Sequence, residues 1–349
     1  MIASPLASLL VVVVAAAAAW LVALLVGEWA RRRHILDLPN ARSSHVRPTP
    51  RLGGIGLVCG VLAGCLLPIG GAIDPRRGGL VLATAVILAA VGLLDDLRGL
   101  SAQLRLVVQL PAGALTVWGL DVVPRAMAAG ASEPLALAFG VLAAIWIVAF
   151  VNAFNFMDGI DGIAAGQALV AGIGWLVLGA AAGDAAVIGL AAPVAGASVG
   201  FLILNWSPAR LFMGDVGSAF LGYLLAAIPL TAADPVALAA PALLLVWPFL
   251  FDTAFTLVRR ARRGERLLDA HRSHLYQRLS APGVSGALTH AQVSRRYMIL
   301  AGVGVPTAWA LATARWVPAA LGVLVATVLA VRLWRATVRV ESTATQAPR

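Results

Sequence analysis

The sequence predicts an all-α, polytopic integral membrane protein, and three observations lead to this fold class. Apolar side chains make up 60% of the 349 residues, and charged side chains make up only 12%. The mean hydropathy is +0.90. Apolar runs of about 17–25 residues recur from end to end, and each is long enough to cross a hydrocarbon core of roughly 30 Å as a helix.

We expect about eleven transmembrane helices in one domain covering residues 1–349, because no stretch is left over for a soluble domain. The first apolar run is too long for a signal-peptide core, so we interpret it as a retained span. The expected spans are residues 5–30, 52–71, 78–94, 103–120, 135–154, 163–182, 185–204, 218–233, 236–257, 298–314 and 317–338.

The loops between these spans form two alternating sets with very different charge. The first set holds residues 31–51, 95–102, 155–162, 205–217 and 258–297 and the C-terminal tail. All 26 basic residues are Arg, and 22 of them lie in or beside this set, against four in the other. The positive-inside rule therefore predicts that the first set and the C-terminus are cytoplasmic and that the N-terminus is outside.

The formal net charge of +10 does not indicate a nucleic-acid-binding protein, because the charges sit in short loops and not on one folded basic face. Cys59 and Cys65 fall within one span. Six residues along a helix correspond to about 9 Å, so we expect two free thiols that pack as small hydrophobic side chains.

The polar stretch that follows the apolar run 135–151 is the centre of the predicted site. Asn152, Asn155, Asp158 and Asp161 recur every three residues, so neighbours in this series share one side of a helix. Ionisable groups at membrane depth are costly unless they face a polar cavity or the interface. The stretch therefore predicts an acidic pocket mouth able to hold a metal ion or a sugar.

Two further acidic stretches end spans on the same predicted side of the membrane. Asp95 and Asp96 directly follow one apolar run, and Asp215 follows Asn205 in the loop after another. Such acids either face a cation or simply cap helices, with Asp96 or Ser101 capping one helix and Asp215 the other. A shared membrane face favours a common site.

Histidines and arginines supply candidate phosphate ligands in two other loops. His271, Arg272 and His274 lie in the long basic loop, where they either donate to a phosphate or sugar or are merely solvated. A hard cation such as Mg²⁺ prefers oxygen ligands to imidazole. The first loop offers cations and hydroxyls, among them Arg47 and Thr49, although topology alone also explains its arginines.

Asp252 lies late in the ninth expected span and is followed by Arg259, Arg260, Arg262 and Arg263. Two interpretations of Asp252 stay open: a structural charge paired with a nearby Arg, or a residue of the site.

Taken together, these stretches resemble the polyprenyl-phosphate N-acetylhexosamine-1-phosphate transferase family of the glycosyltransferase 4 type. That family includes the enzymes that start O-antigen, enterobacterial common antigen and teichoic acid synthesis, and it is related to the phospho-MurNAc-pentapeptide translocase. The matching parts are Asp37-x-Pro39-x-x-Arg42-x-x-His45 with Pro48–Gly54, Asp95-Asp96 through Gly99-Leu100-Ser101, Asn155-x-x-Asp158-Gly159-x-Asp161-Gly162, Asn205 with Phe212-Met213-Gly214-Asp215-x-Gly217, and His271-x-x-His274.

The resemblance implies a Mg²⁺-dependent enzyme of the bacterial cytoplasmic (inner) membrane in which Mn²⁺ can substitute. It would transfer N-acetylhexosamine-1-phosphate from UDP-GlcNAc or a related UDP-sugar to undecaprenyl phosphate. UMP would be released, and a lipid-linked cell-envelope glycan such as lipopolysaccharide or a wall polymer would be started. The implied partners are these two substrates, membrane lipids and a second copy of the chain as a homodimer.

Residue roles carry over by matching positions. The implied catalytic residues are Asp95, Asp96, Asp158, Asp161, His271 and His274; the implied substrate-binding residues are Arg42, His45, Arg47, Thr49, Asn155, Asn205 and Arg272; and the implied metal ligands are Asp215 and Asn155.

The chain departs from the family pattern in two places. The murein-precursor branch has consecutive histidines where this chain has His271-x-x-His274, which favours the N-acetylhexosamine branch over a phospho-MurNAc-pentapeptide transferase. The usual Lys of the first loop is absent, and Arg42 or Arg47 would replace it with a different hydrogen-bond geometry.

Two other classes of protein are alternatives. A CDP-alcohol phosphotransferase would need an Arg soon after Asp158-Gly159 and two further spaced Asp, which residues 162–183 do not supply. A non-catalytic transporter would place its polar groups near the membrane midplane, whereas here they gather at one face.

Overall fold

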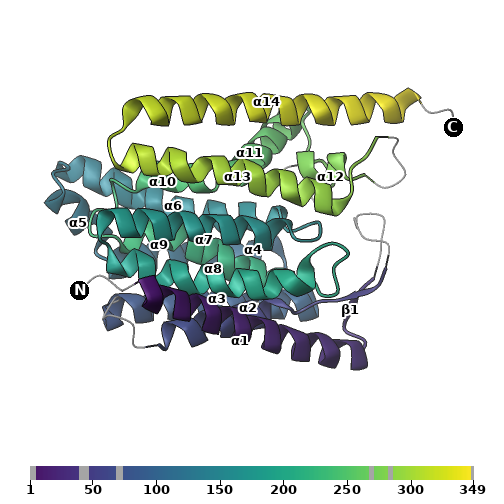
Figure 1. Cartoon of the computed structure of the whole chain (residues 1–349), viewed down its shortest axis with the longest axis horizontal. Coiled ribbons are helices and arrows are strands. Elements are labelled where there is room, and N and C mark those ends of the chain that lie inside the picture. Colours follow the sequence, from purple (N-terminus) through teal and green to yellow (C-terminus); the bar gives the residue numbers. More distant parts are fainter. Residues whose placement is uncertain (1–4, 39–46, 68–73, 267–270, 282–285, 347–349) are drawn as a thin grey trace.

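The computed structural model describes residues 5–38, 47–67, 74–266, 271–281 and 286–346, and these are helical apart from one short strand pair (Figure 1). The elements are α1 (Pro5–Arg32), β1 (Leu36–Asp37), β2 (Thr49–Pro50), α2 (Gly54–Cys65), α3 (Pro75–Arg98), α4 (Ala102–Gly119), α5 (Val122–Ala128), α6 (Glu133–Phe156), α7 (Ile163–Ala182), α8 (Ala185–Asn205), α9 (Gly214–Thr231), α10 (Ala239–Leu245), α11 (Trp247–Arg262), α12 (Leu275–Leu279), α13 (His290–Ala312) and α14 (Trp316–Gln346).

The predicted all-α polytopic fold is confirmed, with seven to nine candidate membrane spans among the described residues where about eleven are expected. Every expected span contains a helix. Within the described ranges, however, only seven helices are long and apolar enough to cross a membrane, or nine if two bent pairs each count as one span. Of the remaining two expected spans, the first is α2, which has 12 residues and is too short to cross alone. The second became α13, which begins earlier than expected, at His290, and includes Arg295 and Arg296.

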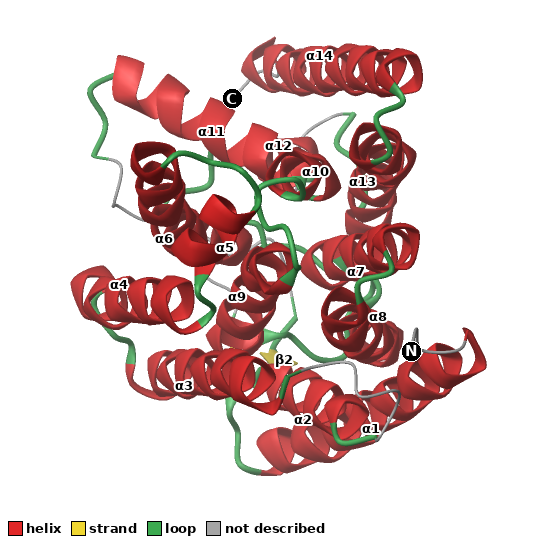
Figure 2. Cartoon of the chain, turned by 90° about the vertical axis from the view of Figure 1, so that its left-hand side faces the viewer, coloured by secondary structure: helices red, strands yellow, loops and turns green. Residues whose placement is uncertain are grey.

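Small residues let the helices approach closely, as in other membrane bundles. Figure 2 looks along the bundle and shows α9 in its interior, surrounded by other helices. Helices α1 and α8 pack along a shared glycine seam. A Cβ on Gly196 would come within 2.4 Å of the Val12 carbonyl oxygen, and one on Gly200 within 2.0 Å of the Ala16 carbonyl oxygen. Larger side chains at these positions would force the two helices apart.

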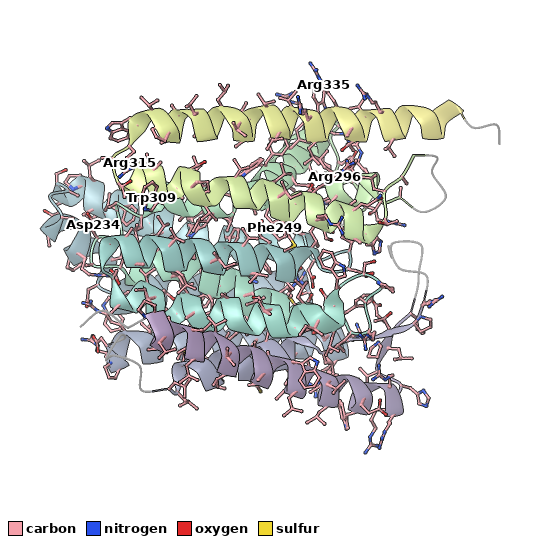
Figure 3. All side chains as sticks on the ribbon, in the orientation of Figure 1. Asp234, Phe249, Arg296, Trp309, Arg315 and Arg335 are labelled. Carbon is pink, nitrogen blue, oxygen red and sulfur yellow. The ribbon has the colours of Figure 1, made fainter. Side chains whose placement is uncertain are left out.

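The two chain ends lie at opposite ends of the bundle in Figure 1, and α12 and β1 lie toward the end that carries the C-terminus. Figure 3 places Arg315, Trp309 and Asp234 toward the other end. There the Arg315 guanidinium lies over the Trp309 ring, 4.7 Å from its centroid. These elements and residues therefore lie toward the two ends of the bundle to which the two loop sets assign them.

Two local features were not predicted. Residues Leu36–Asp37 and Thr49–Pro50 pair as antiparallel strands β1 and β2 at the two ends of the first polar loop. Helices α10 and α11 meet at Val246 with a bend of 81°, so the ninth expected span is broken and not continuous. Cys59 and Cys65 are both free, as expected.

Candidate active site

A cavity of about 480 Å³ brings together most of the acidic residues that the sequence singled out. Seven of the predicted site residues line it, from three stretches far apart in the chain: Asp95, Asp96, Asn155, Asp158, Asp161, Asn205 and Asp215. Other side chains in its wall, which the sequence did not single out as site residues, are Asp37, Arg51, Gln277 and His290. The cavity wall is thus strongly acidic, with few basic side chains.

Asp96 joins the end of α3 to the start of α9. Its two carboxylate oxygens accept the backbone N–H groups of Asp215, at 3.1 Å, and Val216, at 3.0 Å. The first turn of a helix has unpaired N–H groups and a partial positive charge, so a carboxylate there is favourable. The sequence allowed Asp96 to cap the helix that follows it, but Ser101 caps that helix, through the N–H of Leu104.

Two glycines make this junction sterically possible. A Cβ on Gly92 would lie 2.3 Å from the Asp215 carbonyl oxygen. Gly214 has a φ of 71°, and a Cβ there would lie 2.6 Å from Asp96 Oδ2. Only residues without a side chain allow α3 and α9 to approach this closely.

Asp215, the predicted metal ligand, lies in the first turn of α9 and not in the preceding loop. Its Oδ1 accepts a hydrogen bond from Asn155 Nδ2 at 2.7 Å, and Asn155 also donates to Ser218 Oγ at 2.9 Å. Asn155 belongs to the last turn of α6, which extends beyond its predicted end. The two predicted metal ligands are therefore direct neighbours.

Arg105 is a site residue that the sequence reading missed. Its Nη1 donates to Asp215 Oδ2 at 3.2 Å and to Asp95 Oδ2 at 2.9 Å. Asp95 also accepts the Leu100 N–H through its other oxygen. A lone Arg in an apolar helix carries no motif, and in the sequence it could be counted only as a topology charge.

Asp158 lies half-buried in the cavity wall between the other acids. Burial raises the pKa of Asp158 well above its usual range, and the negative charges of Asp215 and Asp96 act in the same direction. Ionising Asp158 is therefore costly unless a cation enters the cavity.

Asp161 and Asn205 hold the loops of the site together. Asp161 Oδ2 accepts the Ala209 N–H at 3.1 Å, and its Oδ1 lies 3.3 Å from His290 Nδ1. Burial raises the pKa of Asp161, but the hydrogen bond and charge of His290 and the Ala209 N–H outweigh it, so the pKa lies below its usual value. Asn205 accepts the Gly162 N–H and donates to the Leu211 carbonyl, both at 3.0 Å.

The predicted histidine pair does not line this cavity. His274 is 2% exposed, and its Nδ1 lies 3.1 Å from Asp252 Oδ1. His271 stacks on His274 with ring centroids 5.0 Å apart, and its Nδ1 pairs with Ser273 Oγ. Burial, with the nearby positive charges of His274 and Arg260, lowers the pKa of His271 to about 4. From this stretch, Gln277 is the residue that reaches the cavity wall.

Asp252 organises the short helix α12 behind the site. Its carboxylate is fully buried and accepts the N–H groups of Leu275 and Tyr276 and the hydroxyl of Tyr297, besides pairing with His274. This geometry favours the structural role that the sequence left open. Because Asp252 caps α12 from another helix, it fixes where that helix lies.

Tyr276 connects α12 to the loop that follows α6. Its hydroxyl donates to the Phe156 carbonyl at 2.9 Å, and a Cβ on Gly159 would lie 2.1 Å from the same hydroxyl. The loop that holds Asp158 and Asp161 is thus packed directly on α12.

The first loop contributes through Arg51. Its Nε is buried without a hydrogen-bond partner in the described part of the chain, and the residue lines the cavity. Of the predicted ligands from this loop, Thr49 is buried and donates to the Arg47 carbonyl, and Arg47 is exposed. Arg42 and His45 lie outside the described residues. Arg272 is half-buried and is not part of the wall.

The donor set suits a hard divalent cation that keeps part of its water shell. Among the described residues no three His, Cys, Asp or Glu side chains converge to hold a metal ion by themselves. Mg²⁺ commonly binds through one or two carboxylates, waters and substrate phosphates. Asp215 and Asp158, which face the same acidic cavity, fit that pattern.

Comparison with known proteins agrees with this architecture. Glycosyl transferase family 4 matches residues 79–233. Over 257 residues, the chain is 30% identical to a probable undecaprenyl-phosphate N-acetylglucosaminyl 1-phosphate transferase of Bacillus subtilis, which covers 72% of this chain and 71% of the relative. It is also 32% identical to the decaprenyl-phosphate N-acetylglucosaminephosphotransferase of Mycolicibacterium smegmatis over 282 residues, covering 71% and 69%.

A phospho-N-acetylmuramoyl-pentapeptide-transferase of Streptococcus pyogenes is 33% identical over 160 residues, which is 42% of this chain and 47% of the relative. The membrane helices and these relatives define the class as an integral membrane phosphoglycosyltransferase. Within that class, the chain belongs to glycosyl transferase family 4. This membership favours a transferase over the transporter and the CDP-alcohol phosphotransferase.

Proposed function

We propose that this enzyme transfers N-acetylhexosamine-1-phosphate from a UDP-N-acetylhexosamine to undecaprenyl phosphate, releases UMP and so starts a cell-envelope glycan. One observation carries the proposal: acids from the end of α3, the loop after α6 and the start of α9 meet in one cavity. Two relatives that each cover about seven-tenths of the chain are named for N-acetylglucosamine-phosphate transfer to polyprenyl phosphates.

The metal side of the site is assigned to Asp215, with Asn155 beside it. Mg²⁺, or Mn²⁺ in its place, would lower the negative charge of the nucleotide diphosphate and stabilise the departing UMP. Asp158 faces the same space and would ionise once a cation is present. Asn155 orients Asp215 through its 2.7 Å hydrogen bond, so its contribution includes positioning.

The acceptor side is assigned to Asp95 and Asp96. Both carboxylates are already fixed by donors, Asp95 by Arg105 and Leu100 and Asp96 by the first turn of α9. A phosphate monoester has a second pKa of about 6 and is mostly dianionic at neutral pH, so it can attack without an enzyme base. We therefore favour direct attack by the lipid phosphate over a covalent aspartyl intermediate.

The histidines His271 and His274 are assigned a positioning role in this scheme. His274 is the N-cap residue of α12 and pairs with Asp252, and His271 stacks on it. The site is proposed to face the cytoplasm, in keeping with the arginine distribution, and membrane lipids and a second copy of the chain are the proposed partners.

The test is an assay of the purified protein with Mg²⁺, undecaprenyl phosphate and a panel of UDP-sugars, including UDP-GlcNAc and UDP-MurNAc-pentapeptide. UMP release that needs both the lipid and a UDP-N-acetylhexosamine is expected. If UDP-MurNAc-pentapeptide is the one UDP-sugar of the panel that is turned over with the lipid, the function is that of the translocase branch. A lipid-independent burst of one UMP per active site would replace direct attack with a covalent intermediate.

A further inference from the structure

We infer that His290 binds the diphosphate of the UDP-sugar donor, oriented by Asp161. The inference builds on the proposed function and adds a substrate contact to it. Among the described residues that line the cavity, only Arg51 and His290 have basic side chains.

Two anionic substrates must enter this acidic cavity, and the two basic side chains lie beside different acids. Arg51 is close enough to Asp96 for its charge to act on that carboxylate. His290 pairs with Asp161 on the loop that follows α6. Since Asp96 is assigned to the acceptor side, Arg51 suits the lipid phosphate and His290 suits the nucleotide diphosphate.

The position of His290 is fixed from several directions. It is the first residue of α13 and lies within the capping box that Thr289 and Gln292 form. One turn later, Ser294 Oγ donates to the Asp161 backbone carbonyl at 2.6 Å. The start of α13 is therefore attached to the Asp161 loop through two side chains, and the imidazole is only 15% exposed.

The ring is held by one nitrogen and has the other available. Nδ1 lies 3.3 Å from Asp161 Oδ1, and Nε2 has no hydrogen-bond partner among the described residues, although it is not enclosed by protein. A carboxylate bound at one nitrogen fixes the orientation of the ring and directs the other nitrogen to a ligand. Nδ1 thus faces the carboxylate, and Nε2 is the atom left to meet a phosphate oxygen.

The two nitrogens can be tested separately, because an Asn side chain places its amide near the position of Nδ1 and a Gln side chain places its amide near Nε2. We would measure kcat and KM for the UDP-sugar, the affinity for the UDP-sugar without lipid, and the melting temperature. His290→Asn should lower donor affinity and kcat/KM by about 10- to 100-fold, the range for a lost hydrogen bond to a charged group.

His290→Gln should keep donor affinity and kcat/KM within about threefold of wild type, which is half a decade of the affinity scale, and should have a lower melting temperature because the Asp161 contact is broken. His290→Asn should instead keep the melting temperature near that of wild type while donor affinity and kcat/KM fall. His34→Asn, at an exposed position at the end of α1, is the matched control and should change neither quantity.

The outcomes separate this inference from the proposed function. A wild-type protein that releases no UMP from any UDP-N-acetylhexosamine overturns the proposed function itself. If the wild-type protein turns over and His290→Asn keeps wild-type donor affinity, the contact is refuted while the function stands. Equal activity losses in the Asn and Gln variants, in parallel with melting temperature, would leave His290 as a purely structural residue and refute the contact as well.

Discussion

The guanidinium of Arg105 lies 3.2 Å from the carboxylate of Asp215, although 110 residues separate them in the chain. The same Nη1 atom lies 2.9 Å from Asp95, so one cation lies between the carboxylates assigned to the acceptor and metal sides. Without it, the two carboxylates would repel each other in a partly dehydrated site. Arg105 therefore sets the distance between the two halves of the proposed reaction.

Removing this cation should impair catalysis more than folding. Arg105→Gln should lower kcat/KM for UMP release by about 10- to 100-fold, because a charge-assisted hydrogen bond to each of two acids is lost. Arg105→Lys should recover part of the loss, since it restores the charge without the planar fork. Arg98→Gln, at the exposed end of α3, is the matched control. Activity of Arg105→Gln within threefold of wild type would rule out this role.

Asp215→Asn should abolish turnover while the protein still inserts and folds. The substitution removes a charged metal ligand, which is expected to cost several kcal/mol of transition-state stabilisation, and leaves an acceptor for Asn155. The measurement is UMP release over a range of Mg²⁺ concentrations, with elution in size-exclusion chromatography as the folding control. Wild-type activity at any Mg²⁺ concentration would contradict the metal role.

The raised pKa of Asp158 predicts a pH dependence of stability. A carboxyl group whose pKa is higher in the folded than in the unfolded protein adds stability at low pH, and this is lost as the pH rises through the folded-state value. In chelator, the melting temperature should therefore fall as the pH rises above the usual range of a carboxyl group. Asp158→Asn should reduce the fall, and Mg²⁺ should counteract it in wild type only. A pH profile unchanged by Asp158→Asn would show that this carboxyl group does not titrate in that range.

Asp252→Asn should lower the stability of the protein more than the rate of the chemical step. The carboxylate accepts two backbone N–H groups and a tyrosine hydroxyl, and an amide has only one acceptor oxygen to offer in its place. Leaving buried donors unpaired costs about 1–3 kcal/mol each, so the melting temperature should drop clearly. Activity should return in part on cooling. Glu133→Gln, at the exposed start of α6, is the control. Unchanged stability together with lost activity would instead assign Asp252 to the chemistry.

Membrane orientation can be tested with single cysteines in a background that lacks Cys59 and Cys65. Arg263→Cys, directly after α11 in a loop of the arginine-rich set, should react with an impermeant reagent only in inside-out vesicles, and Asp234→Cys, in the loop between α9 and α10, only in intact cells. The reverse pattern would invert the proposed topology.

How much of the site was predictable depends on what fixed each residue. Asp95, Asp158 and Asp215 could be grouped from the sequence because alternating spans bring alternate loops to one end of the bundle. Helix ends were misjudged by a few residues, since Asp95, Asp96, Asn155 and Asp215 extend their helices instead of following or preceding them. Hydrophobicity marks where a helix leaves the membrane and not where its hydrogen bonds end.

The residues that the sequence reading missed owe their places to tertiary packing. Arg105 and His290 are isolated in helices and have no neighbouring motif, so only the packing of α4 and α13 brings them to Asp215 and Asp161. His274 is the opposite case. Its spacing from His271 predicts a ligand of the site, whereas in the structure it pairs with Asp252 away from the cavity.

The junction between Asp96 and α9 has a consequence for how the two substrates influence each other. The carboxylate group of Asp96 and the main chain of Asp215 cannot move independently, since Gly92 and Gly214 leave no space between the two helices. On the proposed assignment, a lipid phosphate bound beside Asp96 would therefore also act on the first turn of α9, where Asp215 lies. Free-energy coupling is reciprocal, so any factor by which the lipid tightens nucleotide binding is the factor by which the nucleotide tightens lipid binding.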